Sequence, residues 1–69
     1  MKKGIYQHFK GEIYRVVDVA FHSETLEQYV IYHKIKSDEK LWIRPLSMFT
    51  EVIEKDSVKI DRFKFISDE

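Results

Sequence analysis

A short polar run and three histidines are the first places to look for chemistry in this sequence. His22, Ser23 and Glu24 stand together in the run 22–27, HSETLE, and carry the functional groups of a nucleophilic triad. Adjacent residues rarely point at a common centre, and no strained G-x-S-x-G elbow surrounds the serine. In a tight loop such side chains more often bond to backbone amides. We therefore predict a structural loop, with a small enzyme that uses His22-Ser23-Glu24-Thr25 as the rival hypothesis.

The histidines do not form a metal-binding pattern. His8, His22 and His33 are too widely and irregularly spaced for a compact zinc motif, and the chain has no cysteine to supply a thiolate ligand. We expect neither a metal nor another cofactor.

Aromatic and guanidinium groups lie next to each other in the segment 41–44, LWIR. In a strand, Trp42 and Arg44 share one face because side chains alternate between faces. Leu41 and Ile43 share the other face, and we predict that they form part of the interior. An aromatic ring beside a guanidinium on the outside could bind a carboxylate, a phosphate or an aromatic partner.

The same reasoning selects a predicted binding surface. Trp and Tyr favour half-exposed sites, so Trp42 and Tyr32 are the aromatic side chains expected to be partly exposed. The predicted surface contains these two residues with Arg44, His22 and Glu24. The competing interpretation is that Arg44 pairs with Glu24 inside the protein and serves folding alone.

Composition limits the classes of partner. The chain has 69 residues, which predicts one domain, and 12 basic residues balance 12 acidic ones. A net charge of zero gives no general attraction to nucleic acid or to anionic membranes. No apolar run is long enough for a signal peptide core or a membrane span. Together with the absence of cysteine, this predicts a cytoplasmic protein.

The strand-forming residues fall into short runs. Six strands are expected, over 4–10, 12–21, 28–36, 41–44, 50–55 and 58–66. Asp18 is a candidate bulge, and turns are expected at 37–40 and at 56–57. Pro45 should end its strand, since it cannot donate to a ladder. Residues 45–55 fit either a helix or a short helical turn followed by a strand, and we prefer the second.

Strands at such even spacing, with at most one short helical turn, predict a mainly β domain over residues 1–69. A small antiparallel barrel or a strongly bent sheet of five to six strands fits this pattern.

The order of motifs resembles a known bacterial family, the domain of unknown function 1653 family. The residues that carry the resemblance are Gly4-Ile5-Tyr6, His8-Phe9-Lys10-Gly11, Tyr14-Arg15-Val16, the run 22–27, Val30, Tyr32, Leu41-Trp42-Ile43-Arg44-Pro45-Leu46, Met48-Phe49 and Arg62-Phe63. The chain departs from the family at Ser37–Lys40, where Gly is common, and at Asp61, where Pro is common. The resemblance implies a small SH3-like β-barrel in the bacterial cytoplasm, and it implies no activity.

The leading functional prediction is a non-catalytic binding module for a protein segment or nucleic acid. The rivals are the enzyme described above and a structural accessory or homodimer subunit. A monomer or weak homodimer is expected, with no membrane partner.

Overall fold

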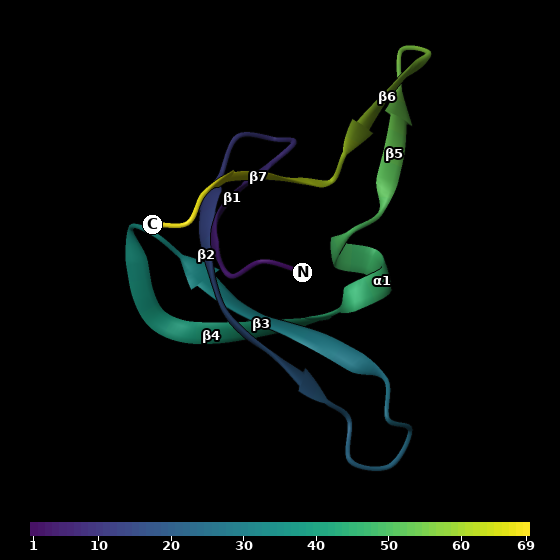
Figure 1. The fold of residues 1–69 in the computed structure, drawn as a ribbon. Helices are drawn as coiled ribbons and strands as arrows, with labels where there is room; N and C mark the ends of the chain where they lie inside the picture. Colours follow the sequence, from purple (N-terminus) through teal and green to yellow (C-terminus); the bar gives the residue numbers. More distant parts are fainter.

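The protein consists of seven strands and one short helix (Figure 1). This computed structural model describes the backbone of residues 1–69 and the side chains of residues 1–36 and 40–69. The elements are β1 (Gly4–His8), β2 (Ile13–Phe21), β3 (Gln28–Lys34), β4 (Ser37–Pro45), α1 (Leu46–Phe49), β5 (Val52–Lys55), β6 (Val58–Asp61) and β7 (Phe63–Ser67).

The strands form two antiparallel sheets. Five strands pair in the order β4-β3-β2-β1-β7, and β5 and β6 form a separate hairpin. The larger sheet curves strongly and α1 lies on its inner side, as Figure 1 shows. Its edge strands β4 and β7 do not pair, so the sheet is strongly bent and does not close into a barrel. The predicted mainly β, antiparallel fold with one short helical turn is confirmed, with a strongly bent sheet in place of the predicted closed barrel, whereas the SH3-like detail stays a prediction.

A bulge in β2 accompanies the bend of the sheet. Val16 pairs with Tyr32, but the next partners are Asp18 and Ile31, so β2 holds one residue without a partner at Val17. The Asp18 carboxylate accepts a hydrogen bond from the Val19 amide at 2.8 Å. This shift in register confirms the bulge expected at Asp18. A bulge of this kind bends and twists its strand locally.

The core lies on the inner face of the larger sheet, which we call the concave face. Its buried side chains are Tyr6, Val16, Val30, Tyr32, Phe49 and Phe63. Phe49 comes from α1 and stacks on Phe63 with 3.9 Å between ring centroids and 5° between planes. The edge-to-face contacts of Tyr32 with both rings complete an aromatic core. Large aromatic rings fill the concave side of the sheet, because a chain of this length is too short to cover it with a second sheet.

The segment after β4 follows the preferred prediction. β4 ends at Pro45, α1 spans only Leu46–Phe49, and β5 follows it. The amide of Thr50 donates to the Leu46 carbonyl at 3.0 Å and closes the helical turn. The predicted short helical turn followed by a strand is confirmed.

Two predicted boundaries shift. β3 and β4 are joined by a turn at Ile35 and Lys36 rather than at Ser37–Lys40, and the side chains of 37–39 lie outside the described residues. The predicted strand 58–66 is divided at Arg62 into β6 and β7, which accounts for the seventh strand. The predicted turn at Asp56 and Ser57 is confirmed. Both residues have positive φ, 54° and 65°, the geometry of a tight hairpin turn.

The predicted interior positions of β4 are wrong. Leu41 and Ile43 are 63% and 65% exposed, because they lie on the outer, convex face of the sheet. Val30 is fully buried and pairs with Arg44, which places Arg44 and Trp42 on the concave face. The alternation within the strand was predicted correctly, and the direction of the core was not.

Candidate binding site on the concave face

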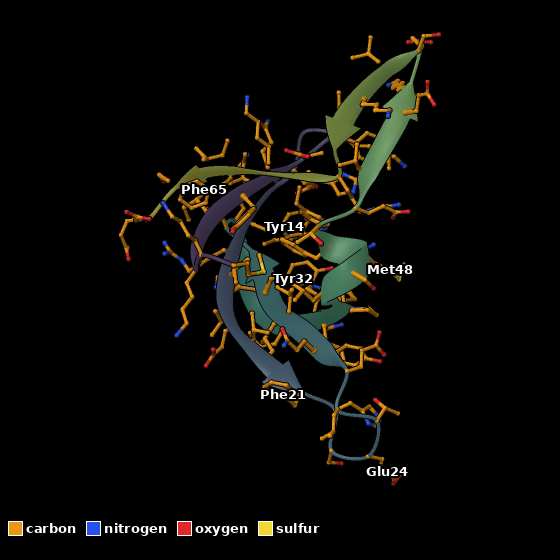
Figure 2. All side chains as sticks on the ribbon, turned by 45° about the vertical axis from the view of Figure 1, so that its right-hand side comes forward. Tyr14, Phe21, Glu24, Tyr32, Met48 and Phe65 are labelled. Atoms are coloured by element: carbon orange, nitrogen blue, oxygen red, sulfur yellow. The ribbon has the colours of Figure 1, made fainter. Side chains whose placement is uncertain are left out.

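Three of the five predicted surface residues lie together. Tyr32 is the cross-strand partner of Trp42, and the Arg44 Nε donates a hydrogen bond to the Tyr32 hydroxyl at 3.2 Å. The three side chains share the concave face, near its open edge at β4. Figure 2 shows Tyr32 pointing into the curve of the sheet, towards α1.

The two aromatic side chains of this group differ in exposure. Trp42 is 49% exposed, as predicted for a half-exposed aromatic residue. Tyr32 is only 6% exposed, so the prediction that it is partly exposed is wrong. Tyr32 packs edge-to-face against Phe49 and against Phe63, which stack on each other, and these contacts bury its ring. Trp42 therefore supplies the accessible ring, and Tyr32 supports Arg44 from within the core.

Arg44 is held in a defined position. Its guanidinium carbon lies 5.5 Å from the centroid of Phe63, and Phe49 stacks on that ring. The hydrogen bond to Tyr32 fixes the Nε end of the group. Among the residues with described side chains, no carboxylate lies within ion-pair distance of Arg44, so the predicted pair with Glu24 does not form there. The half-buried guanidinium keeps its two terminal amino groups for other acceptors.

His8 also packs against Phe63. The centroid of its ring is 4.8 Å from that of Phe63 and 4.5 Å from that of Phe9. The Lys10 amide donates to His8 Nδ1 at 3.1 Å. An acceptor role for Nδ1 places the proton of the neutral ring on Nε2.

The charges around His8 oppose its protonation. Burial lowers the pKa of His8, and the nearby positive charges of Arg44, Arg62 and Lys10 lower it further. Glu12 acts in the opposite direction and is the smallest of these influences. The neutral form, with Nε2–H as a donor, is therefore favoured at neutral pH.

Tyr14 is the third polar group around the same ring. Its centroid lies 5.6 Å from that of Phe63 and 5.3 Å from that of Tyr32. Burial raises the pKa of Tyr14, with smaller contributions from Glu12 and Tyr32, while Arg44 acts against the rise. Within the described part of the chain, its hydroxyl has no hydrogen-bond partner.

Sequence reasoning did not select His8 or Tyr14 for the predicted surface. Both belong to the motifs that carry the family resemblance, which is the one signal that could have pointed to them. They share a neighbour with Arg44, because all three lie against Phe63 from β7, the strand at the opposite edge of the sheet. No spacing within the sequence indicates that contact.

The other two predicted residues, His22 and Glu24, lie in the loop between β2 and β3. Figure 2 shows Glu24 at the tip of this loop, away from Tyr32. His22 Nδ1 accepts hydrogen bonds from the amides of Glu24 and Thr25 at 3.1 and 3.3 Å. The structure does not bring His22 and Glu24 to Trp42 and Arg44.

The predicted bonding of polar loop side chains to backbone amides is also found at Thr25. Thr25 Oγ1 accepts from the Glu27 amide at 3.2 Å, and Leu26 has a φ of 65°. In the described residues, the Glu24 carboxylate meets neither of its predicted partners, a cation or an amide. His22 Nδ1, which accepts two backbone amides, is the main side-chain acceptor in the turn.

Two surface pockets lie near the turn between β1 and β2. The first, of about 450 Å³, is lined by Gln7, His8, Phe9, Gly11, Lys59, Ile60, Asp61 and Lys64. The second, of about 550 Å³, is lined by Lys10, Gly11, Glu12, Ile13, Ile35 and Lys36. Neither contains a residue of the 22–27 loop.

Across the described residues, no group of three or more His, Asp or Glu side chains could hold a metal ion. In the same residues, no helix is long and apolar enough to cross a membrane.

Comparison with known proteins identifies the family. The family model described as "Protein of unknown function (DUF1653)" matches residues 4–65. A crystal structure of a DUF1653 protein from Bordetella bronchiseptica has a TM-score of 0.83 and 25% sequence identity, covering 96% of this chain and 87% of that chain. A comparison with curated proteins gave no match. The agreement of motifs, family model and fold shows that this chain belongs to the DUF1653 family.

Proposed function

We propose that the protein is a non-catalytic binding module for a protein segment, which it binds on the concave face at Trp42 and Arg44. The observation that supports this most is the position of Arg44. A guanidinium fixed by Tyr32 and Phe63, without a carboxylate partner among the described side chains, stands beside a half-exposed tryptophan. Trp and Arg are the residue types that most often dominate binding energy in protein interfaces.

The charge distribution favours a protein segment over nucleic acid. The chain carries no net charge, and nucleic-acid binding depends mainly on several cations that neutralise phosphates. At the candidate site, Arg62 is already paired with Glu51 at 2.9 Å. One available guanidinium beside an indole ring fits an apolar peptide with a polar anchor better than a phosphate backbone.

The bonding of the 22–27 loop weighs against the enzyme hypothesis. The two backbone amides that donate to His22 Nδ1 use the atom that a catalytic base would need. We leave His22 and Glu24 outside the proposed surface. The cytoplasmic location and the monomer or weak homodimer remain predictions from the sequence.

Selection from a random peptide library displayed on phage tests the proposal. Trp42 is the only tryptophan, so the change of its fluorescence on titration with a selected peptide reports binding at this position. We expect selected peptides to shift the emission of the wild type and to lose most of their affinity for Trp42→Ala.

The matched control is Ile43→Thr, which changes an exposed residue of the same strand on the convex face and should leave peptide affinity unchanged. Equal binding of the selected peptides by wild type and Trp42→Ala would contradict the proposal. Selection of single-stranded oligonucleotides in a parallel experiment, with affinities that depend on Trp42, would favour the nucleic-acid alternative instead.

A further inference from the structure

We propose that the bound segment is anchored by a carboxylate, held by the terminal amino groups of Arg44, His8 Nε2–H and the Tyr14 hydroxyl. This inference rests on the proposed function, because it names the chemical group that the same concave face recognises. The anchor can be an acidic side chain or the carboxyl terminus of the partner, since both present the same group.

The first argument is that the two terminal amino groups of Arg44 are available for an acceptor. Its Nε is used by the Tyr32 hydroxyl, and in the described part of the chain neither terminal amino group has an acceptor. These two groups form the planar fork that matches a carboxylate with two parallel hydrogen bonds. The contact with Phe63 and the hydrogen bond to Tyr32 restrict the guanidinium, so less conformational entropy is lost when the fork binds.

The second argument is the placement of two neutral donors around the same ring. His8 and Tyr14 both contact Phe63, with centroid distances of 4.8 and 5.6 Å. His8 Nδ1 is occupied by the Lys10 amide, which leaves Nε2–H as its donor. The Tyr14 hydroxyl is without a partner among the described residues, and Arg44 is close enough to influence the pKa of both groups.

The third argument is the charge balance near His8. Glu12 lies 4.0 Å from the Lys34 amine, and Glu51 pairs with Arg62, so these two carboxylates already have cations. Lys10 is exposed, and its amine lies over Phe9 at 5.8 Å. Of the three cations that act on His8, Arg62 has a carboxylate partner and Lys10 is exposed, whereas Arg44 is partly buried and has no carboxylate partner among the described side chains. One charge with two neutral donors suits a monoanionic carboxylate better than a doubly charged phosphate.

Titration with small probes, followed by nuclear magnetic resonance, tests the inference. The four probes are N-acetyl-leucine, N-acetyl-leucinamide, N-acetyl-glutamate amide and inorganic phosphate, and the signals are the Trp42 indole, the Arg44 Nε–H and the His8 ring. The free carboxylate of N-acetyl-leucine should bind at least about tenfold more tightly than its amide. Comparison with N-acetyl-glutamate amide shows whether a terminal or a side-chain carboxylate is preferred.

Binding should also change the titration of His8. A carboxylate beside the ring favours the protonated form, so the pKa of His8 should rise when the probe is bound. The charged groups that already act on this ring are Arg44, Arg62, Lys10 and Glu12, and a carboxylate bound to Arg44 would also offset the charge through which Arg44 lowers the pKa of His8. A rise therefore reports the new anion.

Variants separate the inference from its alternatives. Arg44→Gln should remove the preference for carboxylate over amide, and Arg15→Gln on the convex face should keep it. If Arg44→Gln does not fold, His8→Asn removes the Nε2–H donor and should weaken carboxylate binding about two- to fivefold.

Equal affinity for N-acetyl-leucine and its amide, with the Trp42 signal shifting for both, would overturn the carboxylate anchor and leave the proposed function standing. Tighter binding of phosphate than of either carboxylate would also overturn it.

Discussion

At the scale of single residues, Phe63 joins the core to the candidate site. One side of its ring is stacked on Phe49, and Arg44 and His8 lie within about 6 Å of its centroid. A side chain in this position serves stability and binding together. The exposed Trp42 has no such role in the core, which leads to a direct comparison of two aromatic residues.

Truncation of Trp42 should cost much less stability than truncation of Phe49. Phe49 is 1% exposed, so Phe49→Ala should lower the free energy of unfolding by about 3–5 kcal/mol and unfold much of the protein. Trp42 is 49% exposed, and Trp42→Ala should cost about 1–2 kcal/mol. Urea unfolding followed by circular dichroism measures both. A cost for Trp42→Ala as large as that for Phe49→Ala would show that Trp42 serves the fold.

His8 should make stability depend on pH. Its pKa is below the ordinary 6.5 in the folded protein, so the unfolded chain takes up the proton first as the pH falls. The free energy of unfolding should therefore be unaffected by His8 above pH 6.5 and should decrease as the pH falls through that value. Asn in its place keeps an acceptor for the Lys10 amide and cannot titrate. The difference between wild type and His8→Asn, measured by urea unfolding at pH 7.5 and pH 5, should grow in favour of the variant at low pH. The same difference in free energy of unfolding at both pH values would contradict a lowered pKa of His8.

At the scale of elements, close contact between β1 and β7 depends on a glycine. Gly4 is buried with a φ of +137°, and a Cβ there would overlap the carbonyl oxygen of Ser67. Gly11, in the turn after β1, also has a positive φ, +111°, but has open space around it. Substitution of Gly11 therefore tests backbone strain alone, whereas substitution of Gly4 tests backbone strain together with steric overlap between the strands.

Gly4→Ala should lower stability by about 2–5 kcal/mol, because backbone strain and overpacking add. Gly11→Ala should cost about 1–2 kcal/mol from strain alone. Thermal unfolding of the two variants gives the comparison. Equal melting temperatures would indicate that β7 moves away from β1 without a large penalty.

At the scale of the whole molecule, two sheets share one short chain but not one core. The hairpin of β5 and β6 has only Ile53 and Ile60 partly buried, and every residue of the core cluster lies outside it. Figure 1 shows this hairpin projecting from the curved sheet. Arg62 ties its base, through an ion pair with the Glu51 carboxylate and a hydrogen bond from its amide to the Glu51 carbonyl at 2.9 Å.

We expect the hairpin to open independently of the curved sheet. Amide hydrogens of β5 and β6 should exchange with solvent at least about tenfold faster than those of Val16 and Val30, because few apolar contacts are lost when the hairpin opens. Hydrogen exchange measured by nuclear magnetic resonance tests this. Glu51→Gln should accelerate exchange in the hairpin alone. Equal protection in the two sheets would mean that they unfold as one unit.

Local information in the sequence determined most of the secondary structure. The alternation of apolar and polar residues, the stop at Pro45 and the polar turn at Asp56 predicted strands, their order and the short helical turn. The bulge at Asp18 was also predicted, because a charged residue inside an apolar strand marks a break in the pattern. Each of these signals acts over a few residues and needs no distant partner.

Only the tertiary structure decided which face of β4 points inward and where the site is completed. A period of two cannot distinguish the face with Leu41 from the face with Arg44 when both carry apolar side chains, so burial depends on the sheet curving towards α1. Likewise, Arg44 and His8 both lie against Phe63, which comes from the opposite edge of the sheet. The sequence by itself determined the alternation in each strand, and the curvature of the sheet determined which side of it became the core.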